Sequence, residues 1–305
     1  MNIHSVTPLI ESLAFKNKFE AKVWLKMEAL QPCGSFKVRG IGFACQHYLN
    51  AGAKGFISSS GGNAGLAVAY CARILGVTAR VVVPKTTKQQ AIDLIRREGA
   101  EVIVQGDVWI QAHEYALSLA DEEHIYIHPF DNPLLWQGHA SLIDEVKAQG
   151  VKPDLIVLSV GGGGLMNGVV QGLETNQWQD IPVVAVETQG ANSLAVCMDS
   201  GVHSQLDTVT SVATSLGATK ISEKSFEILS NHNIYSHVVT DAQAVNACLN
   251  FLDDQRVLVE PACGASLSVV YENAEILRDK KNILVIVCGG VGTTVQQLQQ
   301  WHQSL

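Results

Sequence analysis

Charged residues are scarce in this sequence, and runs of basic residues are absent. Asp, Glu, Lys and Arg make up 16% of the 305 residues, and the formal net charge is −8. Such an acidic chain repels nucleic acid and anionic membrane surfaces, so neither is an expected partner. Repeats and proline-rich linkers are also missing. With 47% hydrophobic residues, the chain is expected to fold as one large domain or two closely joined ones.

Cysteine is present, but not at the spacings that are typical of structural cysteine sites. The seven cysteines are scattered and include no Cys-x-x-Cys pair. No two His or Cys residues have the spacing of zinc ligands, so a zinc site is not expected. An odd set of dispersed cysteines is typical of buried, reduced thiols in a cytosolic protein. The first residues lack a basic segment followed by an apolar run, so we expect no signal peptide and a cytoplasmic location.

One long stretch without charge, residues 155–173, holds four consecutive glycines and an asparagine. These residues would break a membrane helix, so we predict a strand, a loop and a helix there. Elsewhere apolar, β-branched runs alternate with Ala- and Leu-rich helical patterns, which indicates parallel sheets covered by helices on both faces. The predicted strands end or lie at residues 55–60, 79–84, 100–106, 125–130, 154–160, 181–188 and 281–290.

The predicted fold class is α/β, with two domains that each contain a mainly parallel twisted sheet flanked by helices. We assign residues 31–137 to a small domain, and residues 1–30 and 138–305 to a large domain. The segment "FDNPLLWQGHAS" is the expected crossing point between them. In open α/β sheets, ligands bind outside the carboxyl ends of the strands. Three such ends carry unusual residues.

The first is "SVGGGGLMNG", which contains Gly161 to Gly164 between a strand and a helix. Backbone N–H groups of consecutive glycines can converge, and the following helix adds its positive end, so the pattern predicts a phosphate cup. It is neither a P-loop nor a dinucleotide fingerprint. A plain flexible turn is the alternative, but four glycines carry an entropic cost that a turn does not require.

The second strand end is "SSSGGNAG", and the third is "VCGG". In the second, Ser, Gly and Asn are either ordinary helix caps or donors that hold a carboxylate. In the third, Cys288 is either a core residue or a weakly polar thiol that faces a ligand.

Lys37 lies in "LQPCGSFKVRG", just after Ser35, which we predict to cap a helix that runs to about Tyr48. A cation in the first turn of a helix opposes the helix dipole, so an exposed lysine gains nothing there. An amine that must lose its proton does gain, because burial and the dipole both lower its pKa. The placement favours chemistry over a surface role.

Together these segments resemble the fold type II pyridoxal 5′-phosphate (PLP) enzymes, the tryptophan-synthase-β-like family, over nearly the whole chain. "GSFKVRG" resembles the Schiff-base lysine motif, "SGGNAG" the substrate-carboxylate loop and "GGGG" the phosphate loop. "PFDNPLLWQGHAS", "VEPACGAS" and "VIVCGG" are most similar to the liver-type serine/threonine dehydratases of that family.

The resemblance implies a role for each matching residue. Lys37 would bind PLP covalently and act as the catalytic base, while Phe36 would pack on the cofactor ring. Asn63 would bind the ring's 3′ oxygen, and Cys288 and Gly289 would face the ring nitrogen. The phosphate would be bound by Gly161, Gly162, Gly163 and Gly164, and the substrate carboxylate by Ser60, Gly61, Gly62, Asn63 and Ala64.

The implied reaction removes water from L-serine, and from L-threonine, to give a keto acid and ammonia. The alternatives within the family are a serine racemase or a β-replacement synthase. A racemase needs a second base, which in that family is a serine where this chain has Gly61. Racemases and sulfhydrylases also usually place a hydroxyl where this chain has Cys288.

The resemblance also implies a homodimer and a cation site, which in racemase-like relatives binds a divalent ion. Here Glu187 and Ala191 match that site, but Ser193 replaces an aspartate. Fewer carboxylates weaken a Mg²⁺ or Ca²⁺ site, so K⁺ is the expected ion, with carbonyls of Leu216 and Ala218 as further ligands. A purely structural, hydrogen-bonded Glu187 is the alternative. No C-terminal regulatory domain is expected, since the sequence ends at Leu305.

Overall fold

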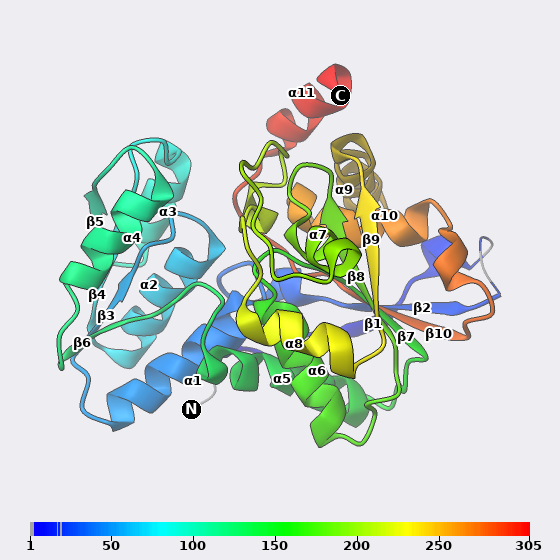
Figure 1. Cartoon of the computed structure of the whole chain (residues 1–305), viewed down its shortest axis with the longest axis horizontal. Helices are drawn as coiled ribbons and strands as arrows, with labels where there is room; N and C mark the ends of the chain where they lie inside the picture. Colours follow the sequence, from blue (N-terminus) through cyan, green and yellow to red (C-terminus); the bar gives the residue numbers. More distant parts are fainter. Residues whose placement is uncertain (1–2, 17, 19) are drawn as a thin grey trace.

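A computed structural model describes residues 3–16, 18 and 20–305. It contains a six-stranded and a four-stranded sheet, which lie on opposite sides of the molecule in Figure 1. This confirms the predicted α/β class with two mainly parallel sheets. Of the described helices, none is long and apolar enough to cross a membrane.

The six-stranded sheet has the order β1-β2-β10-β7-β8-β9, and only the pairing of β1 with β2 is antiparallel. Strands β7 and β8 are buried along their whole lengths, as expected for apolar runs covered on both faces. The strands are β1 Leu9–Glu11, β2 Lys22–Lys26, β7 Leu155–Ser159, β8 Val183–Thr188, β9 Ile234–Val239 and β10 Asn282–Ile286.

The four-stranded sheet is parallel throughout, in the order β5-β4-β3-β6. Strand β3 is fully buried, whereas the edge strand β5 exposes Glu101 and Val104, so the pattern of hydrophobic residues distinguishes centre from edge. The strands are β3 Gly55–Ser58, β4 Thr78–Val83, β5 Glu101–Val104 and β6 His124–Tyr126.

Helices cover both sheets and fill the space between them. Their bounds are α1 Lys37–Asn50, α2 Asn63–Leu75, α3 Gln89–Arg97, α4 Trp109–Ser118, α5 Pro133–Ala148, α6 Gly164–Thr175, α7 Ser193–Ser200, α8 Glu223–Asn231, α9 Asp241–Gln255, α10 Pro261–Tyr271 and α11 Val295–Ser304. The uncharged stretch 155–173 is strand β7, the glycine loop and most of α6, as predicted. Helix α11 carries the C-terminus at the top of Figure 1.

Helix α5 joins the two hydrophobic cores. Near its start, Leu135 packs in the core of the four-stranded sheet, whereas Leu142 and Val146 pack in the core of the six-stranded sheet. The predicted domain border between residues 137 and 138 therefore falls inside one continuous helix. The first 30 residues contribute β1 and β2 to the larger sheet. The exact border remains a prediction.

Candidate active site

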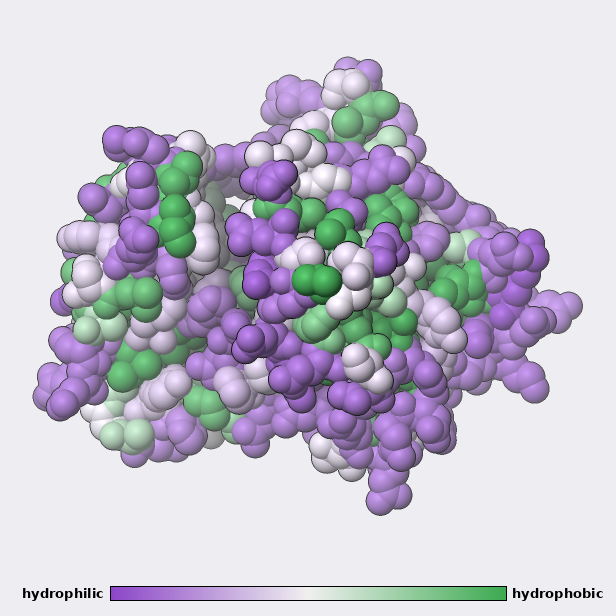
Figure 2. Space-filling view, in the orientation of Figure 1, coloured by the Kyte–Doolittle hydropathy of each residue, from purple (hydrophilic) through white to green (hydrophobic). Residues whose placement is uncertain are grey.

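A cavity of about 990 Å³ lies at the carboxyl ends of strands from both sheets. In the space-filling view, a recess separates the smaller lobe from the rest of the molecule (Figure 2). Most residues predicted for the cofactor and the substrate line this cavity. They are Phe36, Lys37, Ser60, Gly61, Gly62, Asn63, Ala64, Gly161, Gly162, Gly163, Gly164, Cys288 and Gly289. Phe36 and Gly289, which are 253 positions apart in the sequence, thus meet at one place, because parallel strands end at the same edge of a sheet.

Lys37 is the first residue of α1, and its side chain lies on the wall of the cavity. Its Nζ donates a hydrogen bond to the Pro129 carbonyl at 2.6 Å and lies 5.2 Å from the centre of the Phe36 ring. Burial lowers the pKa of Lys37 to about 8, although the acidic groups of Cys288 and Glu260 oppose the change. A considerable fraction of this amine is therefore neutral near pH 8.

Ser35 is not the helix cap that the sequence predicted. Phe36 occupies the cap position with helical dihedral angles of −54° and −20°, and it makes no capping hydrogen bond. Ser35 instead forms a bridge with Gly289, and its buried hydroxyl has no hydrogen-bond partner among the described residues. The prediction was wrong because the backbone enters α1 already in a helical conformation, which leaves the Ser35 hydroxyl facing the cavity region.

The tetraglycine loop, residues 161–164, lies between β7 and α6. In the described part of the chain, no hydrogen bond leaves the N–H groups of residues 161–166. A Cβ on Gly162 would overlap the Phe130 ring, and one on Gly163, which has φ +92°, would overlap the Ser225 hydroxyl. The loop therefore requires glycine, and its free N–H groups at a helix start form a cradle for an anion.

Side chains below the tetraglycine loop hold it in place. Ser222 N–H donates to the Gly162 carbonyl at 3.0 Å. The Asn167 side chain donates to Ser222 Oγ at 3.1 Å and accepts from Ser225 Oγ at 2.8 Å. All three side chains are buried, so the network fixes the anion cradle before any ligand binds.

The serine–glycine loop, residues 60–64, lies between β3 and α2. Ser60 Oγ accepts a hydrogen bond from the Gly62 N–H at 3.3 Å. The N–H groups of Gly61, Asn63 and Ala64 make no hydrogen bond within the described residues, and the last two belong to the first turn of α2. Free donors at a helix start suit a carboxylate. The helix cap itself is Gly62, without a side-chain bond, so the loop residues are not ordinary caps.

Asn63 binds groups on the other side of the cavity. Its Nδ2 donates to Glu260 Oε1 at 2.8 Å, and its Oδ1 accepts from the Val291 N–H at 3.1 Å. Asn63 belongs to the smaller lobe, whereas Glu260 and Val291 follow elements of the larger sheet domain. The bonds to Glu260 and Val291 together determine the orientation of the Asn63 side-chain amide.

Cys288 follows strand β10 and is 7% exposed. Contact with the Cys263 thiol and burial raise the pKa of Cys288 well above its ordinary value. The side chain at this strand end is thus a neutral thiol and not a thiolate. Cys288 lines the same cavity as Lys37.

Three residues that line the cavity or pack behind its wall were not predicted as site residues. Phe130 packs under the tetraglycine loop, Glu260 binds Asn63, and His139 buries its ring 4.9 Å from Phe36. His139 Nδ1 accepts from the Gly40 N–H at 3.2 Å, and burial lowers its pKa, so the ring is neutral. All three belong to "PFDNPLLWQGHAS" or "VEPACGAS", segments already noted for their resemblance, which was the available signal.

The structure places Glu187 outside the cavity. Its buried carboxylate accepts the N–H groups of Leu194 and Ala195 at 2.8 Å each, at the start of α7, and burial raises its pKa to about 7. This hydrogen bonding matches the structural role that was named as the alternative to cation binding by Glu187. Of the other predicted cation ligands, Ala191 and Ser193 are buried nearby in sequence, whereas Leu216 and Ala218 line the cavity. Within the described residues, no cluster of three His, Cys, Asp or Glu side chains can hold a metal ion.

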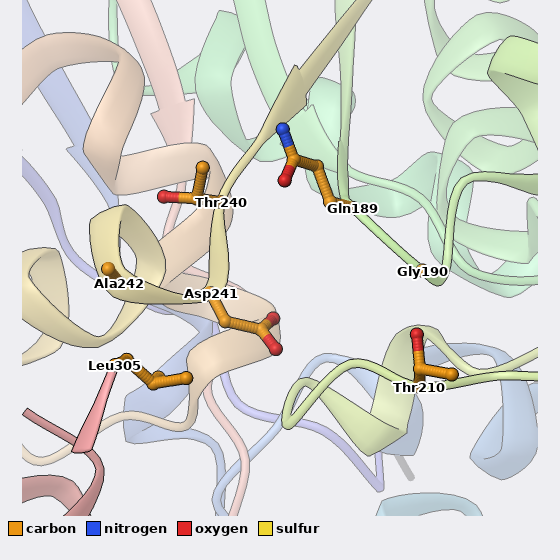
Figure 3. A pocket seen from close by; sticks show the side chains of 7 residues that line it. All are labelled: Gln189, Gly190, Thr210, Thr240, Asp241, Ala242 and Leu305. Carbon is orange, nitrogen blue, oxygen red and sulfur yellow. The ribbon is translucent and has the colours of Figure 1, made fainter.

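A second cavity of about 350 Å³ contains none of the predicted site residues (Figure 3). The Asp241 carboxylate points into it, but it already accepts hydrogen bonds from Ser211 Oγ at 2.5 Å and from the Val212 N–H at 2.9 Å. Its lining consists of Gln189, Gly190, Thr210, Thr240, Asp241, Ala242 and Leu305. The Asp241 carboxylate is thus already engaged in the fold, and the predicted site residues gather in the larger cavity, which is therefore the candidate active site.

The fold and the larger cavity define a class of α/β enzyme. In this class a buried amine shares one cavity with two sets of N–H groups, one suited to a phosphate-like anion and the other to a carboxylate. Comparison with known proteins agrees. Residues 2–289 match the family model described as "Pyridoxal-phosphate dependent enzyme". The chain therefore belongs to the family of PLP-dependent enzymes.

Individual relatives match over nearly their whole lengths. An L-serine dehydratase of Dictyostelium discoideum is 47% identical, with 99% of this chain and 93% of that protein covered. A human L-serine dehydratase/L-threonine deaminase is 43% identical, with 99% and 96% covered. The solved structure of an L-serine ammonia-lyase from the fungus Rhizomucor miehei is 38% identical, has a TM-score of 0.95 and covers 99% of both chains. A maize serine racemase, at 23% identity and a TM-score of 0.87, shows the shared fold alone.

Proposed function

We propose that this chain is a PLP-dependent L-serine ammonia-lyase that also acts on L-threonine. One observation carries the proposal: the amine of Lys37, with a pKa lowered to about 8, lies in one cavity with two separate sets of free N–H groups. One set suits a phosphate and the other a carboxylate. The names of the relatives, L-serine dehydratase and L-threonine deaminase, support the substrate class.

The cavity residues fit PLP. The tetraglycine N–H groups, which have no other partner in the described chain, would bind its phosphate. Lys37 would hold its aldehyde carbon, and Phe36 would pack on its ring. Asn63 would bind the 3′ oxygen, and Cys288 with Gly289 would face the ring nitrogen. When bound, PLP would withdraw electrons from the substrate Cα, which makes the Cα proton acidic and helps the β-hydroxyl to leave.

The protein's own side chains would orient the substrate and move its proton. The serine–glycine loop would hold the substrate carboxylate through Ser60 and the free N–H groups of Gly61, Asn63 and Ala64. Lys37 Nζ, kept partly neutral by burial, would accept the Cα proton. The neutral Cys288 thiol would not place a charge beside the ring nitrogen, which favours elimination over reactions that need a long-lived carbanion.

A keto-acid assay tests this function. Wild-type protein should form pyruvate from L-serine and 2-oxobutanoate from L-threonine, and Lys37→Ala should reduce turnover by about 10²–10⁴-fold or more, because it removes the base and the attachment point. D-serine as product would indicate a racemase, and a thioether formed with an added thiol would indicate a β-replacement synthase. Keto-acid formation by Lys37→Ala at the wild-type rate would contradict the proposal.

We further propose a K⁺ site built from Glu187, Ala191, Ser193, Leu216 and Ala218. Among the described residues, the buried Glu187 carboxylate forms no ion pair, which supports the site, since a bound cation would stabilise its charge. K⁺ should raise the unfolding temperature more than Na⁺ does, and Glu187→Gln should remove the difference. Equal unfolding temperatures in both salts would contradict the site. A homodimeric, cytoplasmic protein also remains a proposal, and light scattering would give its oligomeric state.

A further inference from the structure

The side chain of Asn63 forms hydrogen bonds with two segments of the larger lobe. The loop after β10 donates the Val291 N–H to Asn63 Oδ1 at 3.1 Å. A backbone N–H requires an acceptor, so the Asn63 oxygen must face Val291, and the amide nitrogen must face Glu260. One N–H of that nitrogen binds Glu260 Oε1 at 2.8 Å, and the second is left for a ligand.

The surroundings of Glu260 favour its contact with Asn63 over a capping contact with its own helix, α10. It occupies the cap position of α10, yet its side chain does not cap that helix. The residue is 5% exposed, and its Oε2 accepts the Gly292 N–H at 3.3 Å. A Cβ on Gly290, which has φ +117°, would overlap the Glu260 carboxyl group. The loop after β10 therefore makes room for this carboxylate and wraps around it.

Among the described residues, no cationic side chain is in contact with Glu260, and burial raises the pKa of its carboxyl group although the charge of Lys37 opposes that rise. Glu260 forms no ion pair within this part of the chain. Its oxygens bind Asn63, the Gly292 N–H and the Ser215 side chain instead. A buried carboxylate without a counter-ion costs free energy, and core packing alone does not require one. A role toward the ligand cavity explains its presence.

We propose that Glu260 is a positioning residue: it clamps the Asn63 amide and so holds the start of α2 and the serine–glycine loop against the end of β10. The inference rests on the proposed function, because the loop's ligand is the substrate carboxylate of that reaction. The clamp joins the two lobes directly at the wall of the cavity. It fixes which N–H of Asn63 is free for the cofactor oxygen, and it closes the substrate loop over the cavity.

Glu260→Ala and Asn63→Ala, singly and combined, test the clamp. The first measurement is backbone hydrogen exchange of Leu66 and Ala67, the first hydrogen-bonded N–H groups of α2, in the purified protein with its cofactor and after its removal. Each single variant should accelerate this exchange by about tenfold or more, since a charge-assisted hydrogen bond is lost, and the double variant should add little. Glu272→Ala is the matched control, because Glu272 is the exposed residue at the other end of α10.

The second measurement separates positioning from a general structural defect. Glu260→Ala should raise the KM for L-serine by about tenfold, with a smaller change in kcat and in retention of bound PLP. Glu260→Gln keeps the size of the side chain and one acceptor, so it should lie between wild type and Glu260→Ala. If Glu260→Ala does not fold, the Gln variant carries both measurements.

The outcomes distinguish this inference from the proposed function. Exchange that is unchanged in the Glu260 variants, or single effects that simply add in the double variant, would overturn the clamp even in an enzyme that makes keto acid. A wild-type protein that makes no keto acid, yet shows the coupled exchange, would overturn the proposed function and leave the clamp standing.

Discussion

The tetraglycine loop and the serine–glycine loop repeat one design, a strand followed by a glycine-rich loop and a helix, but the structure holds them differently. Gly162, Gly163 and Gly164 are buried, whereas Gly61 is half-buried and Gly62 is exposed. Packing by Phe130 and a buried Asn167–Ser222–Ser225 network support the first loop. Fewer contacts support the second loop, of which the bonds of Asn63 to the other lobe are the main ones.

This difference matches the residence times expected of the two ligands. A cofactor that stays bound through many turnovers is best held by a cradle that is rigid beforehand, because little ordering entropy is then lost on binding. A substrate must enter and leave in each cycle, so its loop must be able to open. The same backbone design thus serves both ligands, and the side chains around it set the rigidity.

The largest expected effect comes from breaking the rigid loop. Gly163→Ala would place a Cβ against the Ser225 hydroxyl at φ +92°, which combines backbone strain with overpacking and should destabilise the loop by about 2–5 kcal/mol. PLP retention after gel filtration, followed by absorbance, should fall sharply, and the unfolding temperature should drop. Full retention of PLP by this variant would show that the tetraglycine loop is not a preformed cradle.

The next effect concerns Lys37, which is fixed by its bond to Pro129. Its pKa is lowered to about 8, so above pH 8 the folded protein releases a proton that the unfolded chain keeps until its own, higher pKa. The cost of burying the charge is fully present below pH 8 and is relieved as the pH rises through that window. In cofactor-free protein, the unfolding free energy of wild type relative to Lys37→Met should therefore increase from pH 7 to pH 10 in denaturant titrations. A constant difference would contradict the lowered pKa.

How far the sequence predicted this site depends on how local each feature is. The glycine cradle, the Lys37 motif and the Cys288 strand end are short patterns, and the structure brings all of them to one cavity. The bonds from Lys37 to Pro129 and from Asn63 to Glu260 span 92 and 197 residues, so no local pattern encodes them. The cap assigned to Ser35 was wrong for a similar reason, because its bridge to Gly289 sets the entry into α1. The strands predicted in the smaller lobe, and the helix predicted to run to about Tyr48, agree with the structure to within a few residues.

A smaller effect should follow from Ser60→Ala in the serine–glycine loop. The variant loses a hydroxyl that lines the cavity and accepts from the Gly62 N–H, so one hydrogen bond to the substrate and one within the loop are at stake. The bond to the substrate contributes about 0.5–1.5 kcal/mol, so the KM for L-serine should rise by about 2–13-fold. Initial-rate kinetics and PLP absorbance together check this. Loss of PLP in place of a raised KM would assign the loop to the cofactor.

The smallest effect is expected from Gly62→Ala, which repeats the glycine-to-alanine change of Gly163→Ala in the looser loop. A Cβ on Gly62 would meet only the Ser60 hydroxyl, at 3.9 Å, and the backbone φ of −110° lies outside the left-handed region that favours glycine. The unfolding free energy should therefore stay within about 0.5 kcal/mol of wild type, with PLP fully retained. Because the added methyl group faces the cavity, the KM for L-serine should change more than any other property. If Gly62→Ala instead released PLP as readily as Gly163→Ala, the two loops would not differ in rigidity, and the division of cofactor and substrate between them would have to be abandoned.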